Sequence, residues 1–233
     1  MTKNKESIDI KRSGRETFAR VDAYIQEKIL KSRDGFSLLL KAGAGGGRAL
    51  RKPFSYLGTF IGDSGVAAIH PSSKYLVARV VRAVEQGRPR VIVEFGAAEG
   101  VMTKRILKGL PRDGLLAAVE RNAGFYKDLA EIKDARLRTA CGDVRDIKKI
   151  LAGMGVGKAD CFVSGIPFSF LSPAERAALL HEVYCQLQHG GRFVAYQCTT
   201  HLIPLLRKQF QQVKMELEIR NMPPHFVFTA IKK

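Results

Sequence analysis

The chain has 233 residues, enough for one sizeable hydrophobic core with a small extension, so a multidomain organisation is unnecessary. No apolar run is long enough to cross a bilayer, and the N-terminal segment lacks a secretion signal, so we expect a cytoplasmic protein. The formal net charge of +17 is unusual for an enzyme of small neutral metabolites, because such excess charge repels itself without an anionic partner. Nucleic acid and anionic lipid both meet that requirement.

The cysteines argue against a zinc site. Cys141, Cys161, Cys185 and Cys198 lie far apart, with no CxxC pair and no histidine at the spacing that zinc requires. We therefore expect buried thiols and no bound metal.

Residues 1–61 are predicted to form a basic helical extension. Between residues 16 and 32 apolar side chains recur at helical spacing, and the rest of that helix is basic. A glycine-rich joint, Gly43–Gly47, and the apolar stretch Phe54–Ile61 follow. This composition suits the headgroup region of an anionic membrane, and it also suits a helical cap packed on the core.

Residues 62–233 are predicted to form the main domain. From Pro71 onward, helices alternate with short apolar strands, which is typical of a parallel sheet covered by helices on both faces. We expect an α/β fold with a Rossmann-like, seven-stranded, mostly parallel sheet that ends in a hairpin. The predicted strands are Val91–Phe95, Leu115–Glu120, Leu137–Cys141, Cys161–Ser164, Arg192–Gln197, Met215–Arg220 and Phe226–Ile231. The predicted helices are Ser72–Glu85, Val101–Leu110, Ala123–Ile132, one near Asp146–Leu151, Ala174–Leu187 and Ile203–Phe210.

Polar and small residues follow the predicted strands, where an open parallel sheet binds its ligands. The first strand ends in Glu94 and is followed by the small-residue turn Gly96–Gly100. Glu120 ends the second strand, Asp143 follows the third, and Ser164 ends the fourth. This recurrence, once in each strand–helix unit, predicts one ligand site along this edge.

The residue types suit an adenosine-bearing cofactor. A turn of small residues lets the backbone approach a ligand, Glu120 can accept both ribose hydroxyls, and Asp143 can accept the adenine amino group. Dinucleotide enzymes also place an acid after the second strand, but their glycines follow the spacing GxGxxG. Here Gly96 and Gly100 flank Ala98, and an acid precedes the first glycine. This spacing disfavours a nicotinamide cofactor.

Residues Phe60 to Lys233 resemble class I S-adenosylmethionine-dependent methyltransferases. Glu94–Gly100 is similar to their first motif, ExGxGxG, with Ala98 in place of the middle glycine. Val119–Asn122 and Cys141–Asp143 are similar to the second and third motifs. The resemblance implies S-adenosylmethionine as the cofactor. The cofactor-binding residues that we predict are Ser72, Glu94, Gly96, Ala97, Ala98, Gly100, Glu120, Arg121, Gly142, Asp143, Val144 and Ser164.

The fourth motif bears on the methyl acceptor. Ribosomal RNA adenine dimethylases carry Asn or Asp in an (N/D)-x-P-(Y/F) turn, whereas Ser164–Phe168 has glycine at the amide position. A flat adenine amino group would therefore lose its side-chain acceptor. Together with Ala68–Leu76 and Asn221–Pro224, this turn is similar to bacterial phospholipid N-methyltransferases. That resemblance implies a lipid amine such as phosphatidylethanolamine, methylated at the inner face of the membrane, where the N-terminal basic helix docks.

The predicted acceptor pocket is the turn formed by Gly165, Ile166 and Phe168, with the Phe168 ring against the methyl groups. An alkylammonium acceptor must lose a proton before methyl transfer. The candidates for this role are Tyr196, which ends a strand at the active edge and ranks first, and His70, Tyr75 and His201. A ribosomal RNA adenine methyltransferase, a small-molecule amine methyltransferase and a non-enzymatic basic adaptor remain as alternatives.

Overall fold

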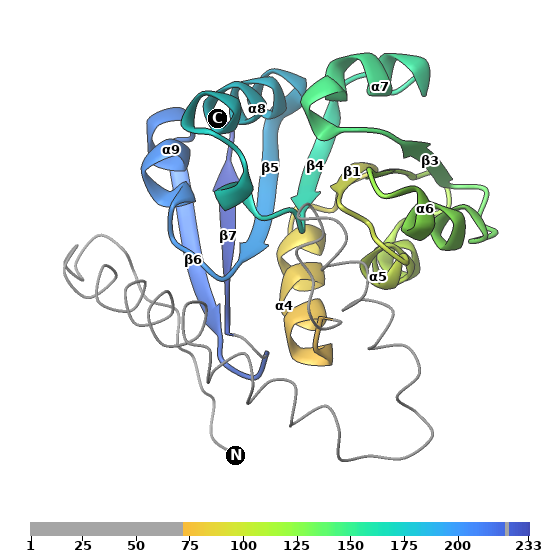
Figure 1. Cartoon of the computed structure of the whole chain (residues 1–233), viewed down its shortest axis with the longest axis horizontal. Helices are drawn as coiled ribbons and strands as arrows, with labels where there is room; N and C mark the ends of the chain where they lie inside the picture. Colours follow the sequence, from red (N-terminus) through yellow and green to blue (C-terminus); the bar gives the residue numbers. More distant parts are fainter. Residues whose placement is uncertain (1–71, 222–223) are drawn as a thin grey trace.

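The computed structural model describes residues 72–221 and 224–233. The predicted extension 1–61 and the candidate His70 lie outside these residues. At the centre is a seven-stranded sheet with the order β3-β2-β1-β4-β5-β7-β6 (Figure 1). The predicted Rossmann-like sheet with a terminal hairpin is confirmed.

The first five strands pair in parallel, and β7 pairs antiparallel with both β5 and β6. The strands are β1 (Val91–Phe95), β2 (Leu115–Glu120), β3 (Leu137–Cys141), β4 (Ala159–Ser164), β5 (Leu187–Gln197), β6 (Gln212–Glu218) and β7 (His225–Ile231). β5 begins earlier than the predicted Arg192, because Leu187 already pairs with Ala159 across a register shift. β6 is offset from the predicted Met215–Arg220, since its pairing with β7 runs from Gln212 to Glu218.

Helices cover both faces of the sheet. They are α4 (Lys74–Glu85), α5 (Val101–Gly109), α6 (Ala123–Ala130), α7 (Ile147–Gly153), α8 (Pro173–Gln186) and α9 (Leu202–Gln209), with short 3-10 turns at Val144–Asp146 and Phe168–Phe170. Helices α4, α5 and α6 pack on one face, and α7, α8 and α9 on the other. Because successive strand residues point to opposite faces, Val93 and Phe95 enter one core, while Ile92 enters the other. The predicted helix near Asp146 is divided into a 3-10 turn and α7.

Local sequence signals explain where two important helices begin. The Ser73 hydroxyl accepts a hydrogen bond from the Leu76 N–H at 3.2 Å and caps α4. At α8, the Ser172 side chain accepts from the Glu175 N–H and the Glu175 carboxylate accepts from the Ser172 N–H, with Pro173 in the first turn. Both caps bring the start of a helix to the edge where the parallel strands end.

The strand order places a crevice between β1 and β4. From β1 the chain moves outward through β2 to β3, and it then returns to form β4 and β5 on the other side. The two connections at this switch point leave in opposite directions, so they open a crevice beyond the strand ends. The ends of β4 and β5 point toward this same edge in Figure 1.

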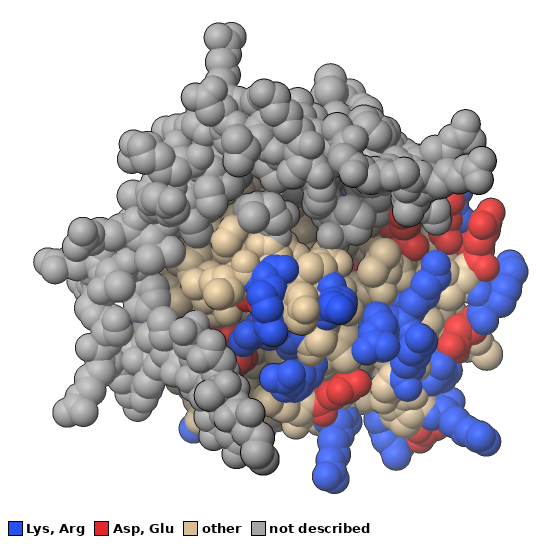
Figure 2. Space-filling model, turned by 90° about the horizontal axis from the view of Figure 1, so that it is seen from below, with Lys and Arg blue, Asp and Glu red and all other residues tan. Residues whose placement is uncertain are grey.

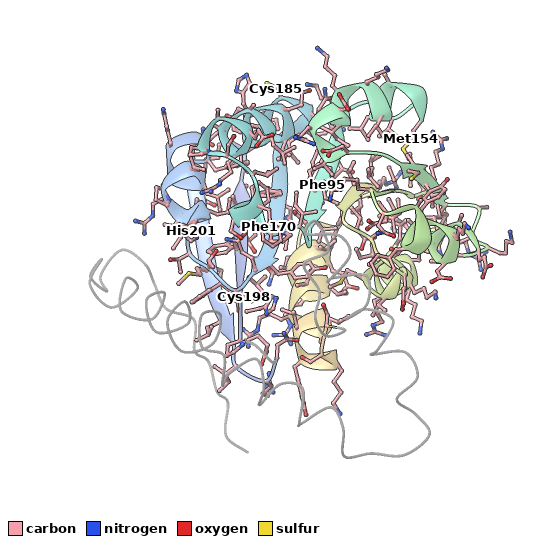
Figure 3. All side chains as sticks on the ribbon, viewed as in Figure 1. Phe95, Met154, Phe170, Cys185, Cys198 and His201 are labelled. Carbon is pink, nitrogen blue, oxygen red and sulfur yellow. The ribbon has the colours of Figure 1, made fainter. Side chains whose placement is uncertain are left out.

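The cysteines depart in part from the expected burial. Cys161 is buried in the sheet and Cys185 and Cys198 are partly buried, but Cys141 is exposed. Cys141 ends β3, the edge strand of the sheet, so no further strand covers it. Figure 3 shows Cys185 near the end of α8 and Cys198 just beyond β5. In residues 72–221 and 224–233, no cluster of three His, Cys, Asp or Glu side chains is placed to hold a metal ion.

No helix in the described part of the chain combines the length and hydropathy needed to cross a bilayer.

Candidate active site

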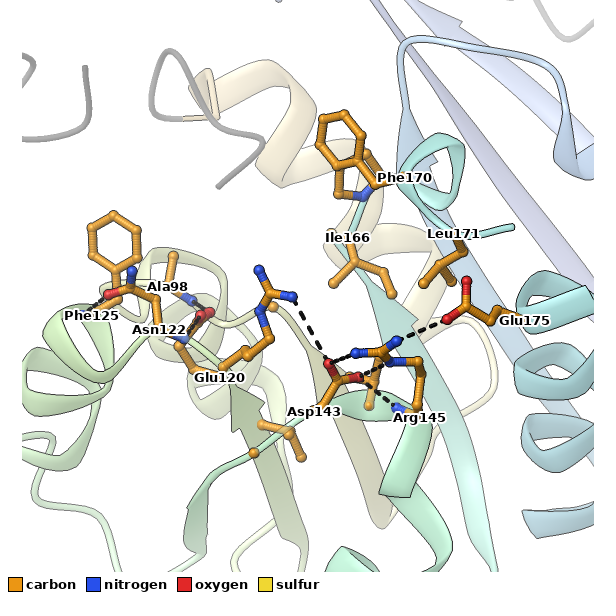
Figure 4. Close-up of a pocket in the computed structure, with 17 residues that line it drawn as sticks. Ala98, Glu120, Asn122, Phe125, Asp143, Arg145, Ile166, Phe170, Leu171 and Glu175 are labelled. Carbon is orange, nitrogen blue, oxygen red and sulfur yellow. Dashed lines mark hydrogen bonds and ion pairs between the residues drawn. The ribbon is translucent and has the colours of Figure 1, made fainter. Parts of the chain in front are cut away.

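A pocket opens at the carboxyl ends of the central strands (Figure 4). Of the residues predicted from the sequence, it brings together Gly96, Ala98, Glu120, Arg121, Gly142, Asp143, Val144, Gly165 and Ile166. Further lining residues are Val119, Asn122, Phe125, Arg145, Pro167, Phe170, Leu171 and Glu175. The site therefore spans the loops after four neighbouring strands, as the recurrence of polar strand ends predicts.

The turn after β1 has an unusual backbone. Gly96 has φ +70°, and a Cβ at this position would lie 2.8 Å from Ile166 Cγ2, so the turn requires glycine there. Ala98 has φ +47°, in the left-handed region that L-residues seldom adopt. In this conformation the Ala98 N–H points at Glu120 and donates to Oε2 at 2.8 Å. The alanine in the middle of the turn thus adopts the conformation that glycine adopts more easily.

We expect Ala98→Gly to leave the free energy of unfolding within about 0.5 kcal/mol of the parent. Relief of the left-handed strain, worth about 1 kcal/mol, is offset by the larger conformational entropy of glycine in the unfolded chain. The matched variant is Ala97→Gly, because Ala97 is buried and has no positive φ. That change should cost about 1 to 2 kcal/mol. Urea titration of both variants measures the difference, and an equal loss in both would contradict the strain at Ala98.

Glu120 is held in one orientation at the end of β2. Its side chain accepts from the Ala98 N–H at 2.8 Å and from the Asn122 N–H at 2.7 Å, one bond to each carboxylate oxygen. Glu120 is buried yet lines the pocket, with Phe125 nearby as an apolar wall. Each carboxylate oxygen has a further lone pair, so the group can accept two hydroxyls from a ligand.

Asp143 is joined to an ion-pair chain that crosses the pocket wall. Its carboxylate accepts from Arg145 Nε at 3.0 Å and Nη2 at 2.8 Å, and Arg145 Nη1 donates to Glu175 at 2.8 Å. Figure 4 shows Arg145 between the two acids, linking the turn after β3 to the start of α8. The Arg145 hydrogen bonds hold the pKa of Asp143 below its ordinary value. Oδ1 also accepts the Arg145 N–H, so Oδ2 accepts fewer of the Arg145 hydrogen bonds and retains more capacity for a ligand donor.

Seven residues predicted for the site do not line the pocket: Ser72, Glu94, Ala97, Gly100, Ser164, Phe168 and Tyr196. Ser72 precedes the cap of α4, Gly100 caps α5, and Ala97 is buried. Glu94 and Ser164 lie inside the sheet, and a buried oxygen of each, Glu94 Oε1 and Ser164 Oγ, has no hydrogen-bond partner among the described residues. These two side chains lie beneath the site and do not form its wall.

Glu94 is a buried acid beneath the site. Its Oε2 accepts a hydrogen bond from Thr103 Oγ1 at 2.6 Å, and its side chain is otherwise enclosed by the core. Burial raises the pKa of Glu94 to about 7, and the nearby negative charge of Glu120 adds to the effect. The carboxyl group is therefore poised to change its charge near neutral pH.

We expect this carboxyl group to make stability depend on pH. Between 4.5, its ordinary pKa, and about 7, folded Glu94 retains a proton that the unfolded chain has released. The free energy of unfolding should therefore fall as the pH rises through this window and level off above it. Glu94→Gln should remove this fall and stabilise the protein at pH 8 by up to about 3 kcal/mol. Urea midpoints at pH 5 and pH 8 measure the slope, and parallel slopes in parent and variant would contradict the assignment.

The predicted acceptor turn, Ser164–Phe168 after β4, contacts Tyr196. A Cβ on Gly165 would lie 2.4 Å from the Tyr196 hydroxyl oxygen, so the tyrosine lies directly against the glycine backbone. Burial, with a smaller contribution from Glu94, raises the pKa of the Tyr196 phenol. The phenol is therefore protonated at neutral pH and offers a neutral oxygen to its surroundings. This disfavours its predicted role as the proton acceptor.

The Phe168 ring lies away from the pocket lining, which counts against its predicted contact with the acceptor. Phe168 is fully buried, and its ring packs edge-on against Phe193 with the centroids 6.1 Å apart. The 3-10 turn Phe168–Phe170 brings Phe170 to the pocket instead, with 57% of its surface exposed (Figure 4). Phe170, and not Phe168, therefore supplies an aromatic side chain at the rim of the pocket.

The other candidate acid–base groups lie away from the pocket lining. Tyr75 is exposed in the first turn of α4, and His201 is exposed beside α9 (Figure 3). His225 neighbours the tyrosine that lies against the acceptor turn, with its ring centroid 6.5 Å from that of Tyr196. It also contacts Asn221 Nδ2 through Nδ1 at 3.0 Å.

Sequence reasoning missed the wall made by Phe125, Arg145, Phe170, Leu171 and Glu175. A capping box, Ser172-x-x-Glu175, was readable and would have placed Glu175 at a helix start near the active edge. No sequence signal shows that Phe170 and not Phe168 reaches the pocket, because both are phenylalanine and only the 3-10 turn orients them.

A sheet of this order, with a small-residue turn and a fixed carboxylate at its switch point, defines a class I S-adenosylmethionine-dependent methyltransferase. No family model matches the sequence. The chain is 31% identical over 175 residues to the ornithine lipid N-methyltransferase of Singulisphaera acidiphila, covering 73% of this chain and 91% of that protein. The chain therefore belongs to the family of that methyltransferase.

Solved structures show the same fold at low sequence identity. The O-methyltransferase from Bacillus cereus, in complex with SAH, has a TM-score of 0.60 at 13% identity, covering 94% of this chain and 99% of that one. The N-methyltransferase NodS from Bradyrhizobium japonicum has a TM-score of 0.56 at 11% identity, covering 67% and 93%. The protein is an S-adenosylmethionine-dependent N-methyltransferase.

The residues of the pocket fit this cofactor. Gly96 and Ala98 expose the backbone of the first turn, Glu120 offers two acceptor oxygens, and Phe125 and Ile166 form apolar walls. When bound, the cofactor would supply an electrophilic methyl group, whose carbon would bond to the amine nitrogen as its bond to the sulfonium sulfur breaks and the thioether leaves. The chain's own contribution is to orient the acceptor and exclude water, because such a displacement needs no covalent enzyme intermediate.

Proposed function

We propose that the enzyme methylates the amine of a membrane lipid headgroup. The observation that carries the proposal is the acceptor turn, where glycine replaces an amide side chain and Tyr196 lies against it. Within the turn Ser164–Phe168 there is no side-chain amide to bind the edge of a nucleobase, whereas backbone carbonyls and a phenol oxygen suit a small alkylamine. The relationship to an ornithine lipid N-methyltransferase supports the same class of acceptor.

In this proposal the acceptor turn aligns the amine. The Tyr196 oxygen accepts a hydrogen bond from an amine N–H, which points the nitrogen lone pair toward the cofactor side of the pocket. Ile166 and the exposed Phe170 contact the alkyl part of the headgroup and exclude water from it. Glu120 and Asp143 hold the ribose and adenine of the cofactor on the opposite wall.

The lipid class and the place of the reaction belong to the same proposal. Phosphatidylethanolamine and ornithine lipid both present a primary amine at the membrane surface. Residues 1–61 dock on the anionic inner face of the membrane, and residues 62–233 carry out the transfer. The net charge of +17 supports attraction to such a surface.

The test is methyl transfer from radiolabelled cofactor to a set of purified acceptors. The full chain is incubated separately with phosphatidylethanolamine, ornithine lipid, total RNA and free ethanolamine, each beside the Glu120→Gln variant as a blank. We expect label in a lipid fraction and none in RNA. Label in RNA alone, or in the free amine alone, would overturn the proposal.

A further inference from the structure

An exposed patch lies where α4 begins and β6 ends. Tyr75 is 40% exposed and Ile219 is 59% exposed, although both are large hydrophobic side chains. Lys74 and Arg220 adjoin them in the sequence and are exposed too. We call Lys74, Tyr75, Ile219 and Arg220 the edge patch. Two exposed hydrophobic side chains beside two cations are typical of surfaces that contact a membrane interface.

Cation–π contacts and ion pairs hold the side chains of the edge patch in place. The Arg220 guanidinium lies 4.2 Å from the Tyr75 ring centroid, and the Lys74 ammonium lies 5.2 Å from it. Arg220 is also bound by Glu218 at 2.8 Å and 3.0 Å, and the Glu218 carboxylate is bound in turn by Arg79 at 3.0 Å. The tyrosine ring is thus flanked by cations in a fixed arrangement. Little conformational entropy remains to be lost on docking.

A chain of side-chain contacts links the edge patch to the acceptor turn. The Ser73 N–H, next to Lys74, donates to Asn221 Oδ1 at 2.8 Å, and Asn221 contacts His225 at 3.0 Å. The His225 ring in turn neighbours Tyr196, which lies against the acceptor turn. Figure 2 views the molecule from this edge, and Lys and Arg side chains outnumber acidic ones in the part of the face whose residues are described.

We propose that the edge patch seats the enzyme on an anionic lipid bilayer. The Tyr75 ring and Ile219 enter the headgroup region, and Lys74 and Arg220 bind lipid phosphates. The inference rests on the proposed lipid-amine function, because a patch at this edge lets a headgroup reach the acceptor turn while its acyl chains stay in the bilayer. It assigns membrane contact to the catalytic domain itself, in addition to the N-terminal extension.

A tryptophan probe tests the contact directly, because the chain contains no tryptophan. Ile219→Trp places an indole in the edge patch, and the matched control His189→Trp places one at an exposed position near the start of β5, at the opposite edge. Both full-length variants are titrated with vesicles of phosphatidylcholine and phosphatidylglycerol that carry brominated acyl chains. We expect blue-shifted, strongly quenched emission from Ile219→Trp and little change from His189→Trp. Equal quenching of both indoles, or bound protein with an unquenched Ile219→Trp indole, overturns the proposal.

A charge variant links docking to turnover. Lys74→Gln with Arg220→Gln should weaken binding to the same vesicles roughly 25-fold, at about fivefold for each cation. Transfer to lipid in vesicles should fall in parallel, while cofactor affinity and transfer to lipid in neutral detergent micelles stay unchanged. The matched control is Lys148→Gln with Lys149→Gln, two exposed lysines on α7. If the control pair weakens vesicle binding equally, the effect comes from the overall positive charge of the protein, and the proposal is overturned.

The two proposals fail in different ways. If the parent methylates no lipid in micelles, the proposed function fails, whatever the tryptophan probe shows. If it methylates lipid in micelles but the edge-patch variants bind vesicles as the parent does, only the docking surface fails. The docking surface also fails if the charge variant loses RNA binding while the Ile219→Trp indole is not quenched by vesicles. That result would assign the edge patch to nucleic acid.

Discussion

Glu120→Gln should raise the dissociation constant for S-adenosylmethionine about a hundredfold. Both oxygens of Glu120 accept backbone N–H groups, so the amide of glutamine must turn its NH2 toward one of these donors. The variant thus loses the charge that strengthens the two ribose hydrogen bonds, and it also disturbs the turn at Ala98. Isothermal titration with the cofactor measures the change. We also expect the free energy of unfolding to fall by about 1 to 3 kcal/mol, since a buried donor is left unpaired.

The control for this prediction is Glu99→Gln, the same change in the same turn. Glu99 does not line the pocket, so its substitution should leave cofactor affinity within about threefold of the parent. If both variants bind as tightly as the parent, the pocket does not hold the ribose, and the assignment of Glu120 is wrong.

Gly165→Ala should lower kcat about a hundredfold while cofactor affinity changes little. The new methyl group would lie 2.4 Å from the Tyr196 hydroxyl and 2.8 Å from the ring carbon that bears it, so the turn or the ring must move. A displacement of about 1 Å in the acceptor position is enough for a loss of this size, because in-line transfer depends on alignment. Steady-state kinetics on the lipid substrate, with parallel cofactor titration, separates the two effects.

Gly157→Ala is the matched control, since a Cβ there meets no atom within 4 Å and the residue has no positive φ. It should leave kcat, cofactor affinity and stability near those of the parent. A comparable loss of kcat in both glycine variants would show that the Gly165 effect is not specific to the acceptor turn. A Gly165→Ala enzyme with parental kcat would show that the contact with Tyr196 does not position the acceptor.

Much of the fold and of the cofactor wall was predictable from sequence because it depends on local patterns. Apolar runs marked β1 and β2 with their correct bounds, since buried parallel strands are apolar on both faces. The carboxyl ends of parallel strands meet at one edge, so Glu120 and Asp143 could be placed together without knowing any contact between them. Segments with mixed signals were less accurate: β5 was predicted too short, since its start is defined by pairing across a register shift.

The sequence by itself determined the class of enzyme, the cofactor and the strand ends that form the pocket. Only the tertiary structure decided which side chains line the pocket beyond those strand ends. It buried Phe168 and exposed Phe170, placed Tyr196 against Gly165, and joined Asp143 to Glu175 through Arg145. It also brought Tyr75 beside Arg220, residues far apart in the chain, to form the edge patch. The physical reason is that strand ends follow from local periodicity, whereas contacts between loops depend on how separate elements pack.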